Sequence, residues 1–221
     1  MQQGIVFGIG GLVLGLVIGF FAANSLNRPG YADAVQPGFP ADTSPNEPGS
    51  AAAMGDVAET LDRADKEPDN FAAQMMAGDM FAKIGNLDRA IEYYGKGLAM
   101  RSEDPAGNLV IANAYFDAGR FEEAGNHYAK VLAIDPDNFA ARTDLGTTFV
   151  ERPSPDYDRA IAEFERVLKT HPDHEPTLYN LAIAYHRKGD IARAQEFSSR
   201  LSAAHPASPL IAKLRQNLEP K

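Results

Sequence analysis

Histidine and carboxylate side chains are the groups in this sequence that could do chemistry, and one cluster is dense enough to consider as a metal site. His171-Pro-Asp-His174 brings two imidazoles and the carboxylate of Asp173 close together in the chain. Zinc is held by three or four ligands, and only Asp173 lies near the two histidines, so we predict a polar turn between repeats and no metal. The acidic pair Glu122-Glu123 falls on the exposed side of an expected helix. Carboxylates there are solvated and are not arranged as a general acid and base.

The composition excludes several other classes of chemistry. The chain has no cysteine, which excludes disulfides, thiolate zinc sites and a cysteine nucleophile. No phosphate loop, metalloprotease helix or nucleophile-and-base set appears, so we predict a protein that is not an enzyme and has no cofactor. The formal net charge of −9 disfavours nucleic acid as a partner, because phosphate backbones attract lysine and arginine.

The spacing of similar stretches is more informative about the elements that carry these residues. The stretch EPDNFAAQ at residues 67–74 returns as DPDNFAAR at residues 135–142, and half of that distance is the period of the sequence. With one short insertion allowed, aromatic residues, glycines and alanines recur with this period. The aligned residues are Phe81, Tyr115, Phe149 and Tyr185; Gly85, Gly119 and Gly189; and Ala90, Ala124, Ala160 and Ala194. A period of about 34 residues, which this one matches, is typical of stacked two-helix repeats.

Residues 105–138 illustrate why each repeat should form two helices. Apolar residues three and four apart, such as Leu109 and Ala112, give the first helix one buried face. Gly119 is expected to end this helix in the left-handed conformation, and Asp135-Pro136 should end the second helix. Ala124 is small, which lets the paired helix cross closely.

These features resemble the tetratricopeptide repeat, in the pairs Leu145-Gly146, Ala124-x-x-x-Tyr128 and Ala160-x-x-x-Phe164. The leading tryptophan of that pattern is absent, and Gln74, Asn108, Arg142 and Leu178 take its places. The resemblance implies an all-α fold, a right-handed α-solenoid of four helix pairs with flanking capping helices. We expect a single transmembrane helix before it, for the reason given below. The predicted boundaries are 1–26 for the membrane helix, 27–50 for a linker, 51–67 for an N-terminal capping helix or degenerate repeat, 68–104, 105–138, 139–174 and 175–208 for the repeats, and 209–221 for a C-terminal capping helix.

In the resembled family the first helices of successive repeats line a concave groove that binds peptide segments of partner proteins. The residues at those positions in this sequence are Met75, Asp79, Lys83, Leu109, Asn113, Phe116, Asp117, Thr143, Thr147, Glu151, Tyr179, Ile183, His186 and Arg187. Apolar members such as Met75, Leu109 and Tyr179 favour an amphipathic helix or an extended apolar peptide as the ligand. Some of these residues could instead pack between repeats.

The N-terminal residues predict a membrane anchor. Gly4 to Ala23 forms a nearly all-apolar run without a charged side chain, which as a helix would span roughly 30 Å of hydrocarbon. The run is long for a signal peptide and lacks a basic start, which favours a retained anchor. Five glycines lie on one face of that helix, where they would let a second membrane helix or a second copy approach closely. They are Gly4, Gly8, Gly11, Gly15 and Gly19.

Three functions remain open from the sequence. The first is a membrane-anchored scaffold in the bacterial inner membrane that binds proteins or peptides through its groove. The second follows from a looser resemblance of residues 144–190 to the repeat domain of cytochrome c maturation factors, and implies an accessory role in that process with the repeats in the periplasm. The third is a self-assembling structural protein. Arg28, the first basic residue after the apolar run, weakly favours the opposite orientation.

Overall fold

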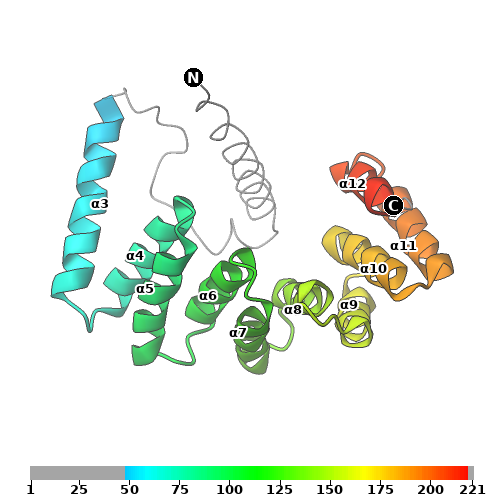
Figure 1. Ribbon diagram of the computed structural model, residues 1–221, viewed down its shortest axis with the longest axis horizontal. Helices are drawn as coiled ribbons and strands as arrows, with labels where there is room; N and C mark the ends of the chain where they lie inside the picture. The colour runs from blue at the N-terminus through cyan, green and yellow to red at the C-terminus, as the bar shows by residue number, and fades with distance from the viewer. Residues whose placement is uncertain (1–47, 219–221) are drawn as a thin grey trace, which may run out of the picture. The chain divides into compact units, whose positions relative to one another are not determined.

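The computed structural model describes residues 48–218, which form ten α-helices and no strand (Figure 1). The helices are α3 (Pro48–Lys66), α4 (Phe71–Lys83), α5 (Leu87–Met100), α6 (Pro105–Asp117), α7 (Phe121–Ile134), α8 (Phe139–Glu151), α9 (Tyr157–Thr170), α10 (Glu175–Lys188), α11 (Ile191–Ala204) and α12 (Pro209–Leu218). The expectation of an all-α fold built of paired helices is therefore confirmed for these residues. The right hand of the solenoid stays a prediction.

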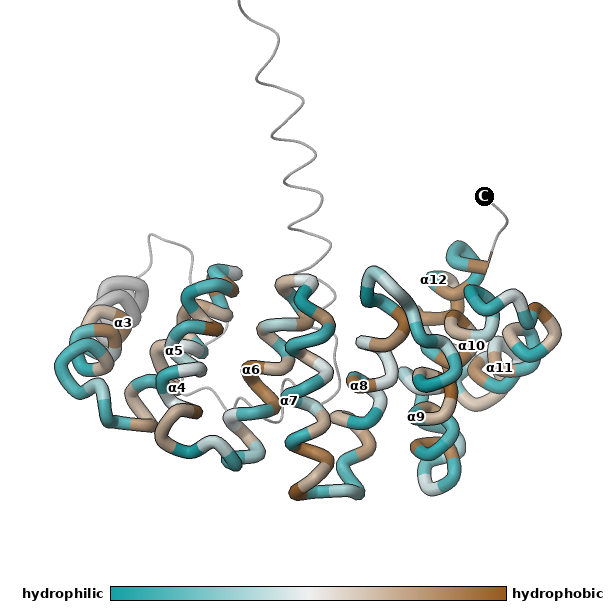
Figure 2. The backbone as a smooth tube through the Cα atoms, turned by 60° about the horizontal axis from the view of Figure 1, so that its bottom comes forward, coloured by the Kyte–Doolittle hydropathy of each residue, from teal (hydrophilic) through white to brown (hydrophobic). Residues whose placement is uncertain are grey.

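The described residues fall into two compact units, which divide within α5 between Gly97 and Leu98. The first unit has a small core in which Ala73, Ala77 and Tyr93 are buried. The second unit stacks the pairs α6 and α7, α8 and α9, and α10 and α11, and α12 packs on α10 and α11. Figure 2 shows apolar and polar segments alternating along these helices, as one buried face per helix requires.

The turn inside each helix pair is closed by one recurring backbone bond. The carbonyls of Phe81, Tyr115, Phe149 and Tyr185 accept from the amides of Asn86, Arg120, Asp156 and Asp190. Three of these turns contain a glycine with positive φ, including Gly119 at 73°, a conformation that strains residues with a Cβ. The predicted left-handed end of α6 is confirmed. In the third repeat the inserted residues form a longer turn that restores the same bond without a glycine.

Small residues mark the place where the two helices of a pair meet. A Cβ on Gly146 of α8 would lie 2.5 Å from the Phe164 ring of α9, and one on Gly78 would lie 2.4 Å from Tyr94. Ala124 and Ala160 are fully buried on the second helices. Close contact of this kind explains why a small residue recurs on both helices of a repeat.

Polar side chains tie three of the repeats to the turn that precedes them. Gln74 donates to the Ala64 carbonyl at 2.6 Å, Asn108 donates to the carbonyls of Ser102 and Asp104, and Arg142 donates to the Pro136 carbonyl at 2.6 Å. The tying residues are those that replace the family's leading tryptophan. These carbonyls lie in the last turn of α3 and in the turns that follow α5 and α7. Leu178 in the fourth repeat is fully buried instead.

The predicted membrane helix at residues 1–26, its glycine stripe (Gly4, Gly8, Gly11, Gly15 and Gly19) and the linker up to residue 47 lie outside the described residues. Between Pro48 and Leu218, no helix has the length and apolar character needed to cross a bilayer.

Candidate functional site

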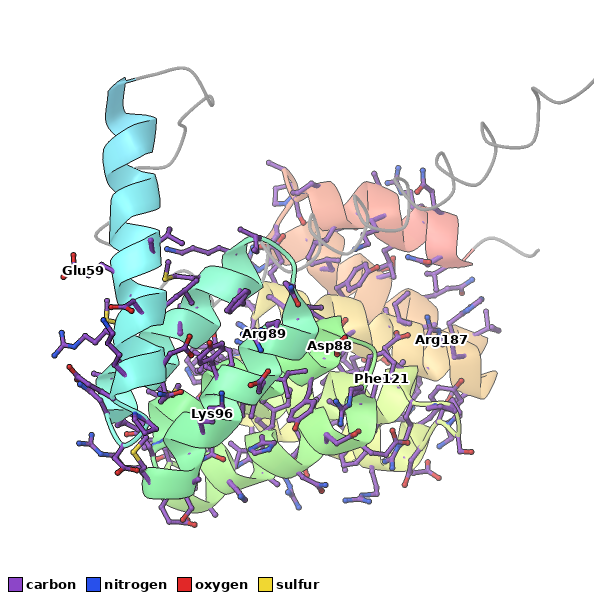
Figure 3. The ribbon with its side chains drawn as sticks, turned by 60° about the vertical axis from the view of Figure 1, so that its left-hand side comes forward. Glu59, Asp88, Arg89, Lys96, Phe121 and Arg187 are labelled. Carbon is purple, nitrogen blue, oxygen red and sulfur yellow. The ribbon has the colours of Figure 1, made fainter. Side chains whose placement is uncertain are left out.

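A ladder of side-chain contacts joins α8 to α10, the first helices of the third and fourth repeats. The hydroxyls of Thr143 and Thr177 lie 2.8 Å apart and are buried. One turn further, Asn180 Nδ2 donates to Thr147 Oγ1 at 3.0 Å. At the end of the ladder, Arg187 Nη1 lies 2.9 Å from Glu151 Oε1, and Arg187 is labelled in Figure 3. These contacts fix the spacing of the two helices along one face.

A pocket of about 50 Å³ opens on this face between α8, α10 and the end of α12. It is lined by Thr147, Val150, Glu151, Tyr179, Asn180, Ile183, Arg187 and Asn217. Pockets that bind small molecules are usually in the range of about 300–1,000 Å³. A cavity of this size suits one side chain of a larger partner.

Tyr179 forms the side of the pocket that faces α12. Its hydroxyl accepts from Asn217 Nδ2 at 3.0 Å, and Lys213 Nζ lies 5.8 Å from the centre of its ring. Burial raises the pKa of the Tyr179 hydroxyl, so it keeps its proton at neutral pH. At the other side, Glu151 and Arg187 neutralise one another as an ion pair that is about two fifths exposed.

Five of the predicted groove residues meet in this pocket, namely Thr147, Glu151, Tyr179, Ile183 and Arg187. Val150, Asn180 and Asn217 were missed. Asn217 stands one full period after Ile183, so extending the repeat pattern beyond the fourth unit would have found it.

Other predicted groove residues are engaged inside the repeats. Asp79 accepts from the Tyr94 hydroxyl at 2.7 Å, and buried Asn113 accepts from Tyr128 at 2.6 Å. The same tie thus recurs at the same sequence separation in two repeats. One oxygen of each residue thus accepts from a tyrosine of the second helix, and a ligand contact at Asp79 or Asn113 stays a prediction.

The remaining groove predictions are scattered. Phe116 is buried edge-to-face against Phe121 at 5.0 Å, and Thr143 is buried in the ladder. Met75 packs its sulfur against Gly97 of α5, and Leu109 packs on the core of the second unit. Asp117 is half-buried and Lys83 exposed at the ends of α6 and α4, and His186 is half-buried at the end of α10.

The histidine pair considered as a metal site has other contacts. The Phe139 ring lies 4.1 Å from His171 and 5.1 Å from His174, centre to centre. His174 Nδ1 lies 2.7 Å from Thr177 Oγ1. Each threonine hydroxyl has one proton to donate. The Thr143 hydroxyl donates to the Phe139 carbonyl, so it accepts from the Thr177 hydroxyl. The Thr177 hydroxyl must then accept from Nδ1 of His174. Burial lowers the pKa of His174.

Comparison with curated proteins finds partial relatives. Residues of this chain are 26% identical over 144 residues to the BBSome complex member BBS4 of Bos taurus, covering 65% of this chain and 27% of that protein. They are 29% identical over 96 residues to the Hsp70-Hsp90 organizing protein of Triticum aestivum, covering 43% of this chain and 16% of that protein. The chain therefore spans about a quarter or less of the length of these two relatives.

Solved structures match over more of the chain. The structure of MamA 41-end from Desulfovibrio magneticus RS-1 has a TM-score of 0.65 at 14% identity, and the match covers 87% of this chain and 97% of that one. A tetratricopeptide repeat protein from Parabacteroides merdae has a TM-score of 0.67 at 17% identity, covering 92% and 72%. At these identities the likeness concerns the fold.

Three family models match successive parts of the chain. Those described as "Tetratricopeptide repeat" match residues 50–108 and 155–218, and one described as "TPR repeat" matches residues 112–151. The matched ranges take up nearly all of residues 50–218, where the helix pairs lie. The chain is a tetratricopeptide repeat protein.

Proposed function

We propose that this protein is a non-enzymatic scaffold that binds a segment of a partner protein on the face formed by α8, α10 and α12. The observation that carries the proposal is the pocket at Tyr179 and Ile183, where five positions expected from the family meet. Tetratricopeptide repeats are protein-interaction modules, and two relatives bear the names of a complex member and an organizing protein. Repeats of this kind present extended surfaces to other polypeptides.

The proposal includes an anchor in the bacterial inner membrane through residues 1–26, with the repeats in the periplasm. It is supported by the long apolar run from Gly4 to Ala23. The run could also bring together two copies through its glycine face. Extraction of membranes with alkaline carbonate tests the anchor. The full chain should stay with the membrane and a chain starting at Ala51 should be released. Protease treatment of spheroplasts then tests the side on which the repeats lie.

The binding face is tested by photocrosslinking in the cells that make the protein. A photoreactive amino acid at Tyr179 should give an adduct with a partner, whereas the same amino acid at Lys169, an exposed residue of α9, should not. Arg187→Glu should reduce the adduct, because it places two carboxylates side by side at the pocket. Equal adducts from both positions would rule out this face as the binding site.

A narrower role as an accessory factor in cytochrome c maturation remains the alternative. Its support is the resemblance of residues 144–190 to the repeat domain of those maturation factors. In that case the crosslinked partner would be an apocytochrome or a haem-handling protein, and mass spectrometry of the adduct would identify it. If purified chains crosslink only to one another, the protein is a self-assembling structural protein instead.

A further inference from the structure

The pocket between α8, α10 and α12 holds hydrogen-bonding groups that the fold does not use. Tyr179 accepts a bond from Asn217, and none of the described residues accepts the proton of the Tyr179 hydroxyl. Asn180 donates one side-chain N–H to Thr147. Asn217 donates both of its side-chain N–H groups, one to the Tyr179 hydroxyl and one to the Lys213 carbonyl. Within the described part of the chain, the Oδ1 atoms of both asparagines have no donor. The face thus offers one hydroxyl donor, one amide N–H and two amide acceptors.

These groups match the needs of a peptide backbone. Each peptide unit carries one N–H and one carbonyl, and both need partners when they leave water. Neutral amides and a phenol bind them without a preference for charge. A nucleic acid or a free carboxylate binds best to an unpaired cationic side chain. Arg187 is already paired with Glu151 at 2.9 Å, so the pocket does not favour an anionic ligand.

The size of the pocket selects the side chain that enters it. An apolar cavity of about 150 Å³ holds benzene, which has six carbons. The pocket here is about 50 Å³, about a third of that value, which leaves room for two or three carbons. Val150 and Ile183 supply the aliphatic part of its lining, and both are buried.

We infer that this pocket receives one short aliphatic side chain, of alanine to valine size, from an extended partner segment whose peptide groups bind Tyr179, Asn180 and Asn217. The inference rests on the proposed function and gives it a partner chemistry. An amphipathic helix is disfavoured at this place, because its backbone N–H and carbonyl groups are already paired within the helix.

The test uses the full chain and five peptides, Gly-Ser-Ser-X-Ser-Ser-Gly with X as glycine, alanine, valine, phenylalanine or glutamate. Methyl NMR follows Val150 and Ile183 during each titration. Alanine should bind about fourfold and valine about 60-fold more tightly than glycine, because each buried carbon adds about fourfold. Phenylalanine and glutamate should bind no better than glycine.

Two variants separate the side-chain pocket from the backbone contacts. Tyr179→Phe keeps the ring and removes the hydroxyl, so it should weaken all five peptides by a similar factor and preserve the preference for valine. Asn180→Leu fills the pocket and should remove the preference. Asn126→Leu makes the same change on the exposed side of α7, and it should alter neither the affinity for the peptides nor the preference for valine. Helical circular dichroism confirms that each variant is folded.

The proposal is overturned if glycine and valine bind alike, if the two methyl signals stay in place, or if no peptide binds at millimolar concentration. Photocrosslinking of the natural partner at Tyr179 decides the proposed function separately. An adduct there together with no preference for valine would remove only this subsite. The absence of both would remove the binding face as well.

Discussion

Replacing Tyr128 with phenylalanine should destabilise the second unit although it removes a single oxygen atom. Tyr128 is fully buried, and its hydroxyl donates to Oδ1 of Asn113, which is 4% exposed, at 2.6 Å. Without the hydroxyl, that buried acceptor loses its donor. Leaving a buried polar group unsatisfied costs about 1–3 kcal/mol. For a chain of about 150–250 residues, this corresponds to a melting temperature lowered by roughly 2–12 °C.

Tyr157→Phe is the matched control, because Tyr157 is half-buried and no described residue pairs with its hydroxyl. Both variants should be compared by urea and thermal unfolding, followed by circular dichroism. The variant Asn113→Ala and the double variant complete a cycle, and the two residues should show a coupling energy of about 0.5–3 kcal/mol. If Tyr128→Phe is as stable as Tyr157→Phe, the internal tie does not exist.

Three further outcomes are expected. Burial raises the pKa of Asp79, so its charged form destabilises the fold at pH 7. Asp79→Asn removes the charge and keeps an acceptor for Tyr94, so it should stabilise the first unit in urea unfolding at pH 7. A loss of stability would contradict this. Burial lowers the pKa of His174 below its ordinary value of 6.5, so its unfolded form binds more protons, and stability should fall as the pH drops below 6.5; His174→Gln should reduce that slope. Gly146→Ala should cost about 1–3 kcal/mol by pressing on the Phe164 ring, whereas Gly95→Ala, which meets nothing within 4 Å, should not.

Most of the fold could be predicted because several different residue types recur with the same period. Aromatic residues such as Tyr115 and Tyr185, glycines such as Gly119, and buried alanines such as Ala124 recur together. Each has a separate physical reason, and all agree on the same helix boundaries. The insertion in the third repeat did not hide the pattern, since the same backbone bond closes its turn.

The site could be predicted only in part. Two residues named from family position, Tyr179 and Arg187, line the pocket, and their contact with a ligand stays a prediction. Family position could not foresee that Tyr94 and Tyr128, on the second helices of their repeats, would donate to Asp79 and Asn113. The coincidence of an acidic or amide residue with a tyrosine at one fixed separation, in two repeats, was a signal in the sequence.

The role of the residues that replace the leading tryptophan could not be predicted from the sequence either. Gln74, Asn108 and Arg142 differ in size and charge, yet each reaches a carbonyl of the preceding turn. A donor on a side chain long enough to reach is the shared property. Leu178 has no such donor. In the fourth repeat the carbonyls of the preceding turn are bound from α11 and its C-terminal end instead. Arg200 contacts the Pro172 carbonyl, and His205 contacts the Asp173 carbonyl.

The longer turn of the third repeat has a practical use. Pro153, Ser154 and Pro155 are exposed, and the bond from Asp156 to the Phe149 carbonyl holds the two helices in place whatever lies between them. Because the sequence contains no cysteine, Ser154→Cys would create a single thiol on the whole chain. A fluorophore attached there would be the single label on the protein in its native setting.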